Sequence, residues 1–191
     1  VRQLALFRTA MANDKAIAAV SEALRSLLAQ AASGPEFSGA RFEIYQATNL
    51  QAPMPEGVSV YLYRVSIDPR RTRIPPGIPP AGPRRPPSLP LDLHYLITAW
   101  SLDPLRQQFI LAWAARVIED APVLPASLLN RRIPGVFGEG ESVQLTVETL
   151  SLEEEAKIWN VAKSNRQPSL AYIARSVEIE SHSKPGEPDV K

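Results

Sequence analysis

Hydrophobic and polar residues alternate along Leu89–Trp100, which lies between a proline-rich segment and a long apolar helical pattern. Every second residue from Leu91 to Ala99 is apolar, which is the spacing of a strand with one face in a core. The opposite face ends in Leu96 and Trp100, so the second half of that face also has an apolar character. A strand that is apolar on both sides lies at the centre of a sheet or at a subunit contact.

Four other stretches have the same period of two. The predicted strands span residues 41–48, 58–68, 90–100, 143–148 and 169–180. Strict alternation along the second strand places Val58, Val60 and Leu62 on one face and Tyr61, Tyr63, Val65 and Ile67 on the other. Strict alternation along the last strand places Ile173, Val177 and Ile179 on one face and Leu170, Tyr172 and Ala174 on the other.

Apolar residues at helical spacing predict helices over residues 14–32, 104–120 and 151–162. Asn13 is the expected N-cap of the first helix, and Asp103-Pro104 opens the second as N-cap and first-turn proline. Ser151 and Glu154 form a capping box for the third. The stripe expected on the second helix consists of Leu105, Phe109, Ala112, Trp113, Arg116 and Val117, widened by Ile110, Ala114 and Ile118. The third helix is expected to carry Leu152, Ala156 and Trp159 on one side.

These elements predict a single α+β domain, with a mixed or antiparallel sheet of about five strands flanked by three main helices. We expect this domain to span residues 13–180, after an N-terminal extension (1–12) and before a disordered tail (181–191). Residues 124–129 are expected to add at most a short helical turn. Because the chain begins with Val, Met11 is the expected natural start.

The segment between Pro69 and Pro90 is a proline-rich loop that cannot form a helix or a central strand. A loop of this length in a compact domain is a binding element or is disordered. Arg84-Arg-Pro-Pro87-Ser-Leu-Pro90 matches the polyproline pattern that SH3-type grooves bind. This match keeps open the alternative of an adaptor or baseplate component that binds a partner through the loop.

The charge balance argues against nucleic acid as a partner, because 21 Lys and Arg residues nearly match 20 Asp and Glu residues. No apolar run of about 18 residues predicts a membrane span. The absence of cysteine excludes disulfides, thiolate nucleophiles and cysteine-based metal sites, and is typical of a cytoplasmic protein.

The sequence contains no catalytic set, cofactor loop or metal site that we can identify. His94 lies within a predicted strand and His182 near the end of the chain, so the two histidines favour no metal centre. The glycines between Gly135 and Gly140 have the wrong spacing for a phosphate loop and predict a turn. Glu153–Glu155 lie in the first helical turn, where acidic residues favour the helix dipole. We therefore predict no enzyme and no cofactor.

Aromatic and basic side chains are the best candidates for a protein interface, because aromatic residues and arginine are enriched in interface cores. For each aromatic candidate taken alone, the favoured interpretation is that it fills a core with two layers. The candidate interface residues are Tyr61, Tyr63, Arg64, Arg84, Arg85, His94, Trp100 and Trp113.

Six segments, in this order and spacing, carry a resemblance to one known family. They are Asp14–Leu28, Val58–Asp68, Pro90–Trp100, Ile118–Leu124, Leu150–Glu154 and Ser169–Ile179. Together they resemble the N-terminal domain of the tail-terminator, or cap, proteins of phage-tail-like contractile injection systems.

The resemblance implies a structural protein with an α+β terminator fold. Members of this family are thought to form a ring of six copies on the last layer of the inner tube and the sheath, where the ring ends their growth. The implied partners are therefore further copies of the chain, the inner tube protein and the sheath protein, in a particle assembled in the cytoplasm. The family has no catalytic residues to transfer to this sequence.

Overall fold

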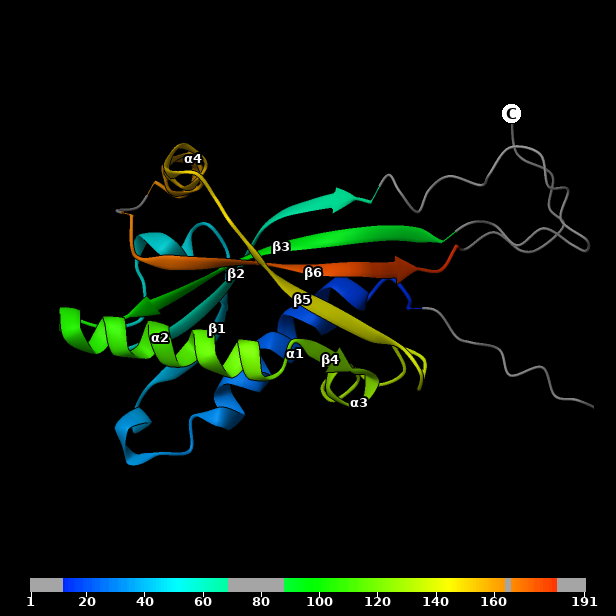
Figure 1. The fold of residues 1–191 in the computed structure, drawn as a ribbon, viewed down its shortest axis with the longest axis horizontal. Helices are drawn as coiled ribbons and strands as arrows, with labels where there is room; N and C mark the ends of the chain where they lie inside the picture. Colours follow the sequence, from blue (N-terminus) through cyan, green and yellow to red (C-terminus); the bar gives the residue numbers. More distant parts are fainter. Residues whose placement is uncertain (1–11, 69–87, 164–165, 182–191) are drawn as a thin grey trace, which may run out of the picture.

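A computed structural model describes residues 12–68, 88–163 and 166–181, and within these ranges six strands form one sheet (Figure 1). The strands are β1 (Arg41–Tyr45), β2 (Gly57–Ile67), β3 (Leu89–Trp100), β4 (Val123–Pro125), β5 (Ser142–Glu148) and β6 (Ser169–Ile179). The helices are α1 (Ala16–Ala31), α2 (Pro104–Asp120), α3 (Ala126–Leu129) and α4 (Leu152–Ala162), with short 3-10 turns η1 (Pro35–Phe37) and η2 (Asn49–Gln51).

The strand order is β1-β2-β3-β6-β5-β4, with β1 and β2 parallel and the other neighbours antiparallel. The mixed sheet and the α+β class are as predicted, and β3 occupies a central position. The sequence analysis missed β4, because its three residues lie next to Pro122 and include Pro125, and proline interrupts a ladder.

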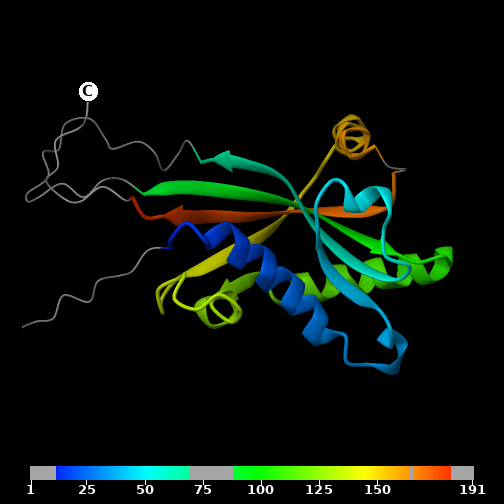
Figure 2. The ribbon, with the colours of Figure 1, turned by 180° about the vertical axis from the view of Figure 1, so that it is seen from behind.

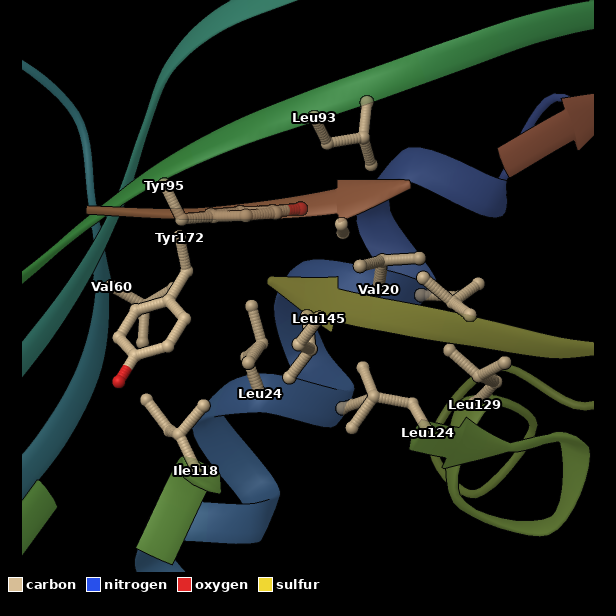
Figure 3. Close-up of a cluster of buried hydrophobic side chains, with 14 of the residues drawn as sticks. Val20, Leu24, Val60, Leu93, Tyr95, Ile118, Leu124, Leu129, Leu145 and Tyr172 are labelled. Carbon is tan, nitrogen blue, oxygen red and sulfur yellow. The ribbon is translucent and has the colours of Figure 1, made fainter. Parts of the chain in front are cut away.

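One face of the sheet, which we call the main face, is covered by α1, α2 and α3, while α4 alone among the helices lies against the other, which we call the second face (Figures 1 and 2). The main-face core contains Leu24 of α1, Tyr95 of β3 and Tyr172 of β6 (Figure 3). Val20, Leu24 and Leu28 are fully buried, which confirms the apolar face predicted for α1. The Tyr95 hydroxyl lies 2.9 Å from Ser21 Oγ, so this deeply buried phenol has a polar partner.

The α2 helix buries a narrower stripe than the sequence predicted. Ile110, Ala114 and Ile118 are fully buried, whereas Leu105 and Phe109 of the expected main stripe are exposed. The prediction was wrong for Leu105, Phe109, Ala112 and Arg116, which are exposed, whereas Trp113 and Val117 of the expected stripe are half-buried against the core. The wider apolar surface at its N-terminal end stays outside the core.

Helix starts follow local hydrogen bonding, which short motifs largely predict. The Asp103 side chain accepts from the Leu105 N–H, and the capping box between Ser151 and Glu154 is present, as expected. Asn13 is not the N-cap of α1, which is Lys15. Its side-chain oxygen instead accepts from the Lys15 N–H in the turn before the helix.

Two β-bulges change which residues share a face, so strict alternation was wrong beyond them. Tyr63 is the extra residue between the Leu62–Tyr95 and Arg64–His94 pairs, so Val65 points to the main face. In β6, Arg175 and Ser176 interrupt the pairing with β3, and Val177 therefore lies in the main-face core rather than beside Ile173. Ser176 has a positive φ of 59° at this irregularity.

A second, smaller apolar cluster lies on the second face, beneath α4 and the η2 turn. Its buried members are Tyr45, Leu50, Met54, Leu96, Trp100, Trp159 and Ala171. Trp159 of α4 meets Trp100 of β3 edge-on, with ring centroids 6.3 Å apart. Leu152 of the same helix is exposed, contrary to the expectation that it shares this buried side. The cluster confirms that the second half of β3 is covered on both faces.

Candidate functional site: a candidate assembly surface on the second face

Glu148, at the end of β5, is the centre of a polar cluster next to the apolar cluster. Its carboxylate accepts a hydrogen bond from the Tyr63 hydroxyl and lies 3.2 Å from Arg64 Nη2. His94 Nδ1 lies 2.9 Å from the same carboxylate. Because a carboxylate can only accept, Nδ1 carries the hydrogen, and Nε2 faces the Ser66 hydroxyl at 2.9 Å. We refer to these residues as the Glu148 cluster.

Three different strands bring the Glu148 cluster together. Tyr63 and Arg64 lie at the β2 bulge, His94 pairs directly with Arg64 across to β3, and Glu148 comes from β5 on the other side of β6. His94 and Glu148 are buried or nearly so, whereas the Arg64 side chain is about half exposed. Burial and the neighbouring Glu148 carboxylate raise the pKa of Tyr63 well above its usual value. Tyr63 therefore stays neutral and donates to Glu148.

We expect Glu148→Gln to lower the free energy of unfolding by about 1–3 kcal/mol, because charge-assisted hydrogen bonds to a nearly buried carboxylate are lost. The amide keeps the shape of the side chain but carries no charge for Arg64. Urea unfolding of the two proteins measures the difference. Glu43→Gln is the control, since Glu43 forms an exposed ion pair with Arg41 and its loss is expected to cost less than about 0.5 kcal/mol. Equal effects of the two substitutions would contradict this account of the cluster.

The other candidate interface residues are placed differently. Tyr61 is half-buried against the second-face cluster, and Trp100 is buried in it, with its indole nitrogen donating to Ser59 Oγ at 2.8 Å. Trp113 of α2 packs between the rings of Phe37 and Phe42 at the edge of the main core. Arg84 and Arg85, with most of the proline-rich loop, lie outside the described residues.

The second face beyond α4 carries polar residues that the sequence analysis did not single out. Asp92 of β3 accepts from the Ser176 N–H at 3.1 Å and lies 3.4 Å from Arg175 Nη1. Arg175 Nε in turn donates to Thr146 Oγ1 of β5. The pairing of these side chains depends on the β6 bulge, which no sequence signal predicted.

Exposed apolar side chains also lie outside these polar clusters. Leu102, Leu105 and Phe109 lie at the N-terminal end of α2, where Arg106 also stacks over the Phe109 ring. Ile44 and Val147 lie on β1 and β5, near the two edges of the sheet.

Three observations on the described ranges concern metal ions, membranes and buried polar groups. No group of three or more His, Asp or Glu side chains in them could hold a metal ion. None of the helices in these ranges combines the length and the apolar character that crossing a membrane requires. Every buried side-chain polar atom there has a hydrogen-bond partner.

The arrangement of sheet and helices is similar to that of two solved proteins. The cryo-EM structure of the PVC sheath/tube terminator, from an extracellular contractile injection system in its extended state, matches with a TM-score of 0.59 and 17% identity, over 92% of this chain and 61% of that chain. The cap of the anti-feeding prophage, a tube terminating cap, matches with a TM-score of 0.58 and 19% identity, over 88% of this chain and 56% of that chain. The chain thus spans about three fifths of the length of these solved proteins.

The chain belongs to the Pvc16 N-terminal domain family, whose model matches residues 19–191. This confirms the resemblance inferred from the six segments, and it confirms the fold class. No protein with a curated description matches the sequence.

Proposed function

We propose that this chain is the assembling domain of a cap that ends the growth of the sheath and inner tube of a contractile injection system. Copies of the chain form a closed ring, with six members as the expected number, on the last layer of tube and sheath. The ring lacks the surface that another layer needs, so growth stops. Its role is structural, and it acts by binding to the end of the tube and sheath.

Family membership across residues 19–191 is the observation that carries this proposal. The fold supports it, because two solved terminators share this arrangement of elements over most of the chain. The exposed apolar side chains on α2 and at the sheet edges are also what a subunit needs, since an assembly must bury surface beyond the core of each copy.

Cells that lack the gene are expected to build tubes and sheaths of uncontrolled length, because nothing closes the growing end. Negative-stain measurement of particle lengths provides the test, and the wild-type gene supplied in trans should restore a narrow distribution. A narrow distribution in the strain without the gene would overturn the proposal.

The adaptor alternative depends on the proline-rich loop, so deletion of residues 72–87 separates the two functions. A terminator with a peripheral loop still caps tubes after this deletion. If the shortened protein loses every partner, the adaptor is favoured instead.

A further inference from the structure

The outer edge of β1 offers unpaired main-chain groups. The Arg41 N–H donates to the Glu56 carbonyl, next to Gly57 of β2, so Arg41 directs its main-chain groups inward. Successive residues of a strand direct these groups to opposite edges, so those of Phe42 and Ile44 point outward. No described residue pairs with them. The β1 edge, as we call Phe42–Ile44, contains no proline to block another strand.

A second free edge lies on the other side of the sheet. There the C-terminal part of β5 extends beyond the three residues that pair with β4. The Leu145 N–H donates to the Pro122 carbonyl at 2.8 Å, so Leu145 and Val147 direct their main-chain groups outward. Proline has no N–H, so the pairing stops there, and the carbonyl of Leu145 receives nothing from Pro122. Among the described residues nothing pairs with Val147, whose side chain is 57% exposed. We call Leu145–Val147 the β5 edge.

The two edges match each other in their side chains. Phe42 packs at the main-face core and Ile44 shares its side of β1, while Val147 pairs with Tyr172, also a main-face residue. Ile44, which is 43% exposed, and Val147 therefore present apolar side chains on the same face. An antiparallel alignment with Phe42 opposite Val147 also places Arg41 opposite Glu148, so that no two like charges lie opposite each other.

We propose that the β1 edge of one copy pairs with the β5 edge of the next, so that the sheet continues from subunit to subunit. The two edges lie on opposite sides of the sheet, so each copy keeps one free edge after pairing. Such a head-to-tail contact closes into a ring when its rotation closes. This contact rests on the proposed cap function and names the surface through which the ring forms.

The natural absence of cysteine allows a direct test by cross-linking. Ile44→Cys and Val147→Cys proteins, mixed and treated with a short bismaleimide, are expected to give a covalent dimer, whereas neither protein alone does so. A protein carrying both substitutions should give a ladder that ends at the ring size. Val161→Cys mixed with Val147→Cys is the control, because Val161 is also exposed but belongs to α4 rather than to either edge. Dimers from Ile44→Cys alone, or no cross-links in the mixture, would overturn the contact.

Lysine at the β5 edge provides an independent test. Val147→Lys is expected to abolish the multimer mass in light scattering, while Val65→Lys, at a main-face valine 45% exposed, leaves it unchanged. Equal behaviour of these variants, at matched thermal stability, would overturn the edge contact. Capped tube ends without cross-links also overturn the contact and leave the cap function standing. Cross-linked rings that never cap a tube overturn the cap function and leave the contact standing.

Discussion

Replacing Gly57 with alanine is expected to cost at least about 3 kcal/mol of folding stability, because the glycine lies against the backbone of the neighbouring strand. Gly57 has a φ of +142°, and an added Cβ would lie 1.9 Å from the carbonyl oxygen of Arg41. This atom belongs to the β1–β2 ladder, so the clash cannot be relieved by rotating a side chain. Chemical denaturation measures the loss, and hydrogen exchange should show that β1 separates from the sheet first.

Gly39→Ala is the matched control for this substitution. Gly39 also has a positive φ, +88°, but an added Cβ there meets nothing within 4 Å. Its replacement therefore reports only the conformational cost, about 1–2 kcal/mol. Equal losses for the two variants would show that close approach between strands does not explain the glycine at position 57. Because β1 provides one edge of the proposed subunit contact, Gly57→Ala should also fail to form rings.

Trp159→Ala is expected to release α4 from the sheet, with a cost of about 3–5 kcal/mol for the folded state. Among the α4 side chains that the structure describes, Trp159 is the one that is fully buried. Its ring packs edge-on against Trp100. Its removal leaves a cavity in the second-face cluster, next to the Trp100 ring. Hydrogen exchange should increase in α4 far more than in α1, whose contacts lie on the main face.

Val161→Ala tests whether the loss is specific to the buried ring. Val161 belongs to the same helix but is 74% exposed, so its truncation should change stability by less than about 0.5 kcal/mol. If Trp159→Ala unfolds no more easily than Val161→Ala, then α4 is held by other contacts.

Features that depend on a single helix or strand could be predicted from the sequence. The α1 helix, the five longer strands and the caps at Asp103 and Ser151 follow from side-chain spacing and from hydrogen bonds between near neighbours. The two apolar sides of β3 predicted a central strand or a subunit contact, and the structure shows a central strand with both faces covered. The resemblance of six segments to terminators also needed only the sequence.

Features that depend on residues far apart in the chain could be defined only by the tertiary structure. The bulges at Tyr63 and Ser176 turned Val65 and Val177 to the other face, and a bulge appears only when one strand is matched against its partner. The same pairing joined His94 to Glu148 across 54 residues and left the β1 and β5 edges open. Sequence periodicity therefore determined the elements, because it reports each segment's own two faces. The Glu148 cluster and the free edges are relations between segments, so only the folded chain could define them.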